Sequence, residues 1–177
     1  MGIIILDRDG VINYDSVDYI KSTGEWQALP GSIEAIALLS KAGHKIYIAS
    51  NQAGLARGLF NLNTLNLMHE KLSDLVDEAG GVIDGIFYCP HHPNDNCECR
   101  KPKIGLLEQI SLHSGKSLIG VPFVGDSEKD IEAAIDMGCQ PILVETGNGK
   151  ITKANIDEKV PCFIDLLTFA QHFLNVC

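Results

Sequence analysis

The chain has 177 residues, of which 45% are hydrophobic and only 6% aromatic, and its formal net charge is −9. A chain of this length and apolar content can bury its own core, so we expect residues 1–177 to form a single domain. The excess of acidic residues disfavours nonspecific binding to nucleic acid or to an anionic membrane surface.

No stretch of the sequence approaches the ~20 consecutive apolar residues that a membrane-spanning helix needs. Met1-Gly2 leads directly into an apolar run, without a basic leader or a cleavage site. We therefore expect a cytoplasmic protein that binds neither nucleic acid nor membrane. We also expect it to be a monomer.

Strands and helices alternate along the chain. Short apolar runs bounded by turn residues predict strands at 3–6, 45–49, 83–88, 118–124 and 141–144. Capping residues and helical spacing predict helices at 30–41, at 64–79 with Thr64 as the N-cap, at about 104–114, and from Ser127 to Gly138. A short segment at 160–164 and a helix to about residue 176 complete the tail. This alternation is typical of an α/β fold with a mainly parallel sheet between two layers of helices.

Two aspartates follow the first predicted strand, in the sequence Asp7-Arg8-Asp9-Gly10. Side chains two apart on an extended segment share a face, so Asp7 and Asp9 converge on one point. Carboxylates so close repel unless a cation, a donor or a proton relieves them. The pattern therefore suits Mg²⁺ and phosphoryl transfer, although Asp and Gly also end strands simply as turn formers.

Polar residues end the later strands as well. The carboxyl ends of parallel strands lie at one sheet edge, where open α/β sheets bind their ligands. The residues expected there are Ser50, Asn51 and Gln52 after the second strand, Arg100 and Lys101 after the third, and Asp126 after the fourth. Alternatives remain open for some of them: Ser50-Asn51 as a plain turn, Asp126 as a helix cap, Lys103 in place of Lys101, and Asp130 as an ordinary solvated helix residue.

Three of the six cysteines fall within eleven residues, between Cys89 and Cys99. Cys89, His91, Cys97 and Cys99 supply the Cys₃His ligand set of a tetrahedral zinc site. With no evident open coordination position, such a zinc would be structural, ordering the loop 89–99 next to Arg100 and Lys101. The alternative is a surface loop with reduced cysteines.

This ordered set of motifs resembles the haloacid dehalogenase (HAD) superfamily of phosphohydrolases. The resemblance covers residues 3–146 and rests on DxDG at 7–10, Ser50, Lys101 and GDxxxD at 125–130. It implies a three-layer Rossmann-like fold, Asp7 as nucleophile and Asp9 as general acid/base. It also implies Mg²⁺ held by Asp7, Asp126 and the backbone carbonyl of Asp9, with Ser50 and Lys101 on the transferred phosphoryl group.

The zinc loop narrows the resemblance to members without a large cap domain, which include heptose-1,7-bisphosphate 7-phosphatases and histidinol-phosphate phosphatases. Residues 13–15, 51–58 and 89–93 look like the heptose enzymes, which act in lipopolysaccharide-core and nucleotide-heptose biosynthesis. The expected substrate contacts are Asp15, Asp18, Asn51, Gln52, Arg57 and Arg100. Arg57 would suit a second phosphate, or it is an ordinary surface arginine. Alternatives are histidinol phosphate as substrate and a non-catalytic zinc-loop interaction module.

Overall fold

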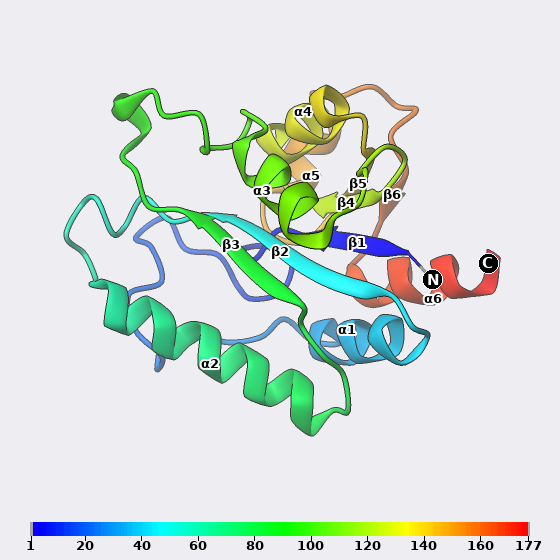
Figure 1. Ribbon diagram of the computed structural model, residues 1–177, viewed down its shortest axis with the longest axis horizontal. Coiled ribbons are helices and arrows are strands. Elements are labelled where there is room, and N and C mark those ends of the chain that lie inside the picture. The colour runs from blue at the N-terminus through cyan, green and yellow to red at the C-terminus, as the bar shows by residue number, and fades with distance from the viewer. Residues whose placement is uncertain (1, 177) are drawn as a thin grey trace.

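The computed structural model describes residues 2–176, in which six parallel strands form one sheet with helices on both faces (Figure 1). The strands are β1 (Ile3–Leu6), β2 (Lys45–Asn51), β3 (Gly85–Cys89), β4 (Pro122–Gly125), β5 (Gln140–Val144) and β6 (Cys162–Phe163). The helices are α1 (Ser32–Lys41), α2 (Leu62–Glu78), α3 (Gly105–Ser114), α4 (Glu128–Met137), α5 (Gly149–Lys153) and α6 (Leu166–Val176), with a 3₁₀ turn η1 (Pro93–Asp95).

The strand order is β3-β2-β1-β4-β5-β6, so β1 lies in the middle of the sheet. The chain moves outward from β1 to β3, then crosses back to β4 on the other side of β1. This reversal creates a crevice at the carboxyl ends of β1 and β4, where open α/β sheets bind ligands. All four residues of β1 are buried, as an apolar strand covered on both faces should be.

Two apolar clusters fill the space between the sheet and its helices. One joins α1, α2 and α6 to one face of the sheet, and the other joins α3 and α4 to the opposite face. Figure 1 shows the same division, with α1, α2 and α6 on one side of the strands and α3, α4 and α5 on the other. The predicted three-layer α/β architecture is confirmed.

The structure departs from the sequence predictions in two helices. Helix α2 begins at Leu62, because the Asn61 side chain accepts a hydrogen bond from the Thr64 backbone N–H and takes the N-cap position predicted for Thr64. Helix α5 was not predicted, since five residues are too few to show a helical period. Within α4, Ile131 and Ala134 are buried, whereas Ile135 is 57% exposed.

No large cap domain interrupts the described residues 2–176. Between β1 and α1, residues 7–31 contain no helix. Within the same described range, no helix has the length and apolar character needed to span a membrane.

Candidate active site

Three carboxylates meet at the crevice between β1 and β4. Asp7 follows β1, Asp126 follows β4, and Asp130 lies in the first turn of α4. One carboxylate oxygen from each lies within 4.8 Å of the others, and all three side chains are buried. The Nζ of Lys101 lies 2.8 Å from Asp7 Oδ1 and 2.6 Å from Asp130 Oδ1. This ammonium also donates to the Ala49 carbonyl of β2, at 2.8 Å.

This cluster carries more negative than positive charge, since three carboxylates face one ammonium. Burial and the neighbouring Asp130 raise the pKa of Asp7 well above its usual range, although Lys101 opposes that rise. The same two causes raise the pKa of Asp126 to about 7. A hard divalent cation with oxygen ligands would relieve this repulsion, so the residues present fit Mg²⁺.

Gly10 lets Asp126 approach β1 closely. Its φ is +84°, a conformation that disfavours residues with a Cβ. A Cβ at this position would collide with the Asp126 carboxylate, and one at Gly147 would do the same. The glycine of the DxDG motif is therefore required by the space that Asp126 occupies.

The side chain of Asp9 bonds to residues outside the Asp7/Asp126/Asp130 cluster. Its oxygens accept hydrogen bonds from Arg8, from Asn13 Nδ2 at 2.8 Å and from Gln52 Nε2 at 3.0 Å. Burial raises the pKa of Asp9, but the Arg8 guanidinium and these hydrogen bonds outweigh it and leave the pKa lowered. The Asp9 carboxylate is therefore separate from the Asp7/Asp126/Asp130 cluster, and the metal contact predicted for its backbone carbonyl stays a prediction.

Asn51, at the end of β2, fixes the backbone of Lys101. Its Oδ1 accepts from the Lys101 N–H at 3.0 Å, and its Nδ2 donates to the Lys101 carbonyl at 3.1 Å. Lys103 instead pairs with Glu98 on the zinc loop and is partly exposed, so Lys101 is the lysine that reaches Asp7. Ser50 is buried, and its hydroxyl accepts from Gln52 at 2.7 Å.

These residues surround a cavity of about 350 Å³. Of the predicted site residues, its lining includes Asp7, Asp9, Asp15, Asn51, Gln52, Arg100, Lys101 and Asp126. Ser50 lies behind Gln52 and outside this lining, whereas Asp18 and Arg57 are exposed outside it. Arg57 instead stacks on Tyr19, with its guanidinium carbon 5.7 Å from the ring centroid.

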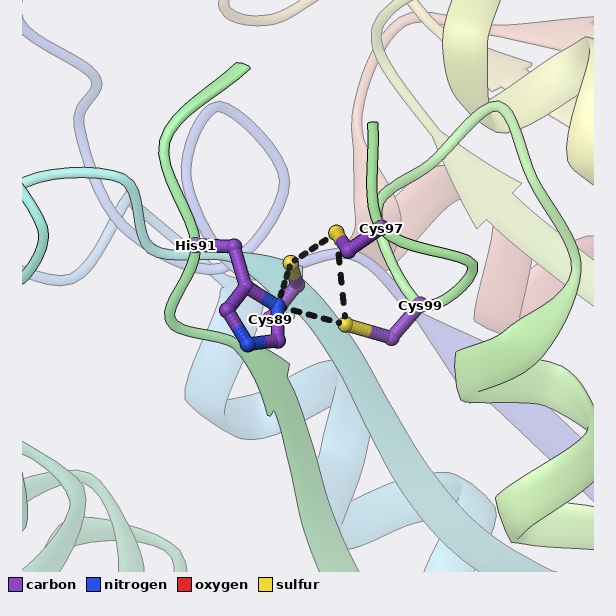
Figure 2. A group of neighbouring side chains, drawn as sticks. All are labelled: Cys89, His91, Cys97 and Cys99. Atoms are coloured by element: carbon purple, nitrogen blue, oxygen red, sulfur yellow. Dashed lines mark hydrogen bonds between the residues drawn. The ribbon is translucent and has the colours of Figure 1, made fainter. Parts of the chain in front are cut away.

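The zinc loop, residues 89–99, brings its four candidate ligands together, as Figure 2 shows. Cys89 Sγ lies 3.5 Å from Cys97 Sγ, which lies 3.7 Å from Cys99 Sγ. His91 Nδ1 lies 3.6 Å from the sulfur of Cys89 and 3.2 Å from that of Cys99. Tetrahedral zinc places neighbouring sulfurs about 3.8 Å apart and a sulfur and a nitrogen about 3.5 Å apart. The four side chains therefore fit a tetrahedral zinc ion.

Comparisons with known proteins agree with this geometry. A HAD-hydrolase-like family model matches residues 98–166. D-glycero-beta-D-manno-heptose-1,7-bisphosphate 7-phosphatase from Pseudomonas putida is 51% identical, over 98% of this chain and 100% of its own length. The same-named protein from Pseudomonas aeruginosa is 52% identical over 97% of each chain. The chain belongs to this phosphatase family.

A solved structure supports the same assignment. The crystal structure of D,D-heptose 1,7-bisphosphate phosphatase from Bordetella bronchiseptica, complexed with magnesium and phosphate, superposes with a TM-score of 0.97. Its sequence is 48% identical to this chain, and each chain covers 100% of the other. The predicted resemblance to the HAD superfamily, and to its heptose-bisphosphate phosphatase family, is confirmed.

In this member of the phosphatase family, sequence reasoning missed several residues that the fold brings to the cavity. Asn148, after β5, donates its backbone N–H to Asp126 Oδ2 at 2.8 Å and lines the cavity. Lys129, in the first turn of α4, also lines it and adds a cation to those of Arg100 and Lys101. Lys129 could have been predicted from the sequence, because it directly precedes Asp130 in the GDxxxD motif. No sequence pattern around Asn148 indicates that it reaches the site.

Proposed function

We propose that this protein is a Mg²⁺-dependent phosphatase that removes the 7-phosphate of D-glycero-β-D-manno-heptose 1,7-bisphosphate, in lipopolysaccharide-core or nucleotide-heptose biosynthesis. The observation that carries this proposal is the cluster of Asp7, Asp126, Asp130 and Lys101 at the floor of a cavity that further cations line. The names of the relatives supply the substrate and its anomer.

In the first step, an Asp7 carboxylate oxygen bonds to phosphorus while the bond from phosphorus to the sugar oxygen breaks. Asp9 gives its proton to that departing oxygen. In the second step, a water oxygen bonds to phosphorus, the bond from phosphorus to Asp7 breaks, and Asp9 accepts the proton of the water. Mg²⁺ held by Asp7 and Asp126 would neutralise charge between the nucleophile and the phosphoryl oxygens.

Asp9 and Lys101 have to serve both steps. The lowered pKa of Asp9 suits it to accept a proton from water. A dianionic phosphoryl group bound beside it would raise that pKa by like-charge repulsion and favour the protonated form that the first step needs. Lys101, already 2.8 Å from Asp7, is placed to neutralise oxygens of the transferred group.

We assign the non-reacting phosphate to Arg100 and Lys129. Both line the cavity, and both also line a second hollow beside the zinc loop that includes Lys103. One guanidinium nitrogen of Arg100, Nη1, is buried without a hydrogen-bond partner among the described residues. A phosphate would satisfy it and would find local positive charge on an otherwise acidic protein.

Replacing Arg100 with alanine should therefore reduce kcat/KM for heptose 1,7-bisphosphate by roughly 10- to 100-fold, the worth of a charged hydrogen bond of about 1.5–3 kcal/mol. The loss on a simple monophosphate ester should be much smaller, because that ester has no remote phosphate. Arg57→Ala is the matched control, since Arg57 is exposed outside the cavity lining. A selective loss in the Arg57 variant and none in the Arg100 variant would transfer the role to Arg57.

A phosphate-release assay tests the proposed function directly. Heptose 1,7-bisphosphate and histidinol phosphate are compared at equal concentration, with Mg²⁺ and with a chelator. We expect Mg²⁺-dependent release from the heptose at a much higher kcat/KM. A higher kcat/KM for histidinol phosphate would identify that compound as the substrate in place of the heptose bisphosphate. No phosphate release from either compound would favour a non-catalytic zinc-loop module.

We propose that Cys89, His91, Cys97 and Cys99 hold one structural zinc ion per chain. Metal analysis of protein purified without added zinc should find about one equivalent. Cys97→Ser should lose this zinc and lower the melting temperature, whereas Cys162→Ser, outside the cluster, should retain it. Full zinc content in the Cys97 variant would contradict the ligand assignment.

We further propose that residues 1–177 act as one domain and as a cytoplasmic monomer. The zinc assignment supports the compartment, because three cysteines must stay reduced to bind the metal. Size-exclusion chromatography with light scattering would measure the mass of the assembly, and a dimer mass would contradict the monomer.

A further inference from the structure

Arg8, between the two aspartates of the DxDG motif, is almost completely buried, with 1% of its surface exposed. None of the chemical steps proposed above uses it. A buried guanidinium is stable only when its donors find partners and its charge is balanced. The partners of Arg8 therefore indicate what the residue is for.

All three nitrogens of the guanidinium are engaged. Nε and Nη2 donate to Asp9 Oδ1 at 3.1 and 2.8 Å, and Nη2 also donates to Asp9 Oδ2 at 3.2 Å. Nη2 further lies 3.3 Å from Gln52 Oε1, and Nη1 lies 3.3 Å from His69 Nε2. A guanidinium held on every side cannot rotate, so it fixes the carboxylate to which it is bonded.

His69 accepts this hydrogen bond, because arginine has donors only. The imidazole must then be neutral, with its proton on Nδ1. Burial, together with the positive charge of Arg8, lowers the pKa of His69 to about 4, which keeps the ring neutral at physiological pH. The hydrogen-bonding requirement and the electrostatics of the site agree.

The position of His69 in α2 is unusual for a core helix. The other buried residues of α2 are apolar, namely Leu65, Met68, Leu72 and Val76, and they pack into the cluster beneath the sheet. His69 is also buried, with its ring tilted against Tyr88 of β3 at a centroid distance of 5.7 Å. A polar ring replaces an apolar side chain at the point where Arg8 needs an acceptor.

We propose that His69 and Arg8 are positioning residues for Asp9: α2 holds Arg8 through His69, and Arg8 holds the Asp9 carboxylate where it exchanges a proton with the leaving oxygen. This inference rests on the proposed function, in which Asp9 transfers that proton. Neither residue supplies the proton itself. A carboxylate that is free to turn would spend less time within reach of the departing oxygen.

Leaving-group dependence tests the proposal. Heptose 1,7-bisphosphate releases an alkoxide that needs a proton, whereas p-nitrophenyl phosphate releases a stable phenolate that does not. Because the second step needs Asp9 for both esters, the first step is followed alone, as release of the leaving group in a single turnover with enzyme in excess. In His69→Leu, this rate should fall by roughly 10- to 100-fold for heptose 1,7-bisphosphate and by less than about threefold for the aryl ester. His69→Gln, whose carbonyl can accept from Arg8, should recover much of the loss.

Two further variants make the result interpretable. Met68→Ala removes a buried apolar side chain next to His69 in α2, one that offers Arg8 no charged or carbonyl acceptor, so it should lower the melting temperature without changing the ratio of the two rates. Asp9→Asn should show the same selectivity as His69→Leu, more strongly. If the wild-type protein hydrolyses the aryl ester but not heptose 1,7-bisphosphate, only the proposed substrate is wrong. Histidinol phosphate, which is also an alkyl ester, then takes its place in the comparison.

The remaining outcomes decide the inference. Equal losses of the first-step rate on both esters in His69→Leu, or no loss on either, would overturn the positioning role while leaving the proposed phosphatase function intact. An Asp9→Asn variant without leaving-group selectivity would overturn both the proton-transfer role of Asp9 and the inference built on it. Selective loss in His69→Leu with recovery in His69→Gln would establish it.

Discussion

Replacing Asp7 with asparagine should abolish phosphate release while leaving the fold intact. The amide is nearly the same size as the carboxylate but is not a competent nucleophile, and it is a poorer ligand for Mg²⁺. We expect kcat to fall by at least about 10³-fold, which corresponds to about 4 kcal/mol of barrier. Phosphate release from heptose 1,7-bisphosphate at saturating Mg²⁺ measures the effect.

The fold should tolerate Asp7→Asn because the Asp7 carboxylate is buried beside another carboxylate that repels its charge. Burial and Asp130 raise the pKa of Asp7, so its charged form is disfavoured in the folded protein, and Lys101 keeps Asp130 as a partner when Asp7 is neutral. The melting temperature of the metal-free variant should therefore match or exceed that of wild type. Asp18→Asn makes the same chemical change at an exposed position outside the cavity lining and should leave kcat unchanged. Retention of more than about a tenth of the wild-type rate in Asp7→Asn would contradict a covalent role.

The sequence alone predicted the parts of the site that follow from the sheet. Asp7, Asp9, Asn51 and Asp126 lie at or just after the ends of apolar runs, and parallel strands place their carboxyl ends at one edge, so their proximity could be inferred from the sequence. The zinc cluster could be predicted for a different reason, since its four ligands lie within eleven residues of one loop. In both cases the information is local or depends on a general property of parallel sheets.

The rest of the site depends on packing between distant segments. His69 stands in an otherwise ordinary amphipathic helix, and nothing in that pattern says that its ring reaches Arg8, 61 positions earlier in the chain. Asn148 contacts Asp126 from a loop after β5, where helix α5 is too short to be recognised. Arg57, which the sequence suggests for a second phosphate, lies outside the cavity lining but against Tyr19, which belongs to it, so its role stays a prediction. Which of several similar side chains faces the cavity depends on how loops pack, and spacing does not encode that.

Lys101 connects the zinc loop to the active site along the chain. Cys99 is two residues from Lys101, and Asn51 holds the Lys101 backbone from β2 by two hydrogen bonds. The lysine is thus positioned from both sides before its ammonium reaches Asp7 and Asp130. We therefore expect both stability and chemistry to depend on Lys101.

Replacing Lys101 with methionine should therefore damage both properties. Burial opposes the charge of Lys101, but Asp130 and Asp7 raise its pKa above the ordinary lysine range. A pKa raised on folding contributes stability that is complete below the unfolded-state pKa and is lost only as pH rises through the folded-state value. At neutral pH the full contribution is present, and its removal leaves buried carboxylates without their cation. We expect a loss of about 3–5 kcal/mol in the free energy of unfolding, the usual cost of breaking a buried pair.

In the Lys101→Met variant, kcat should also fall, by roughly 10²- to 10³-fold. The negative charge that develops on the phosphoryl oxygens would no longer have a fixed ammonium to neutralise it. Chemical denaturation and phosphate release on the same samples measure the two effects. Lys103→Met is the matched control: Lys103 is partly exposed, pairs with Glu98, and should change stability by less than about 1 kcal/mol and kcat by a small factor. A Lys101 variant as stable and active as the Lys103 variant would show that the buried ammonium is not what balances the charges of Asp7 and Asp130.

The repulsion among the three carboxylates would then have to be relieved by the divalent cation alone, and the stability of the Lys101 variant should rise steeply with Mg²⁺ concentration.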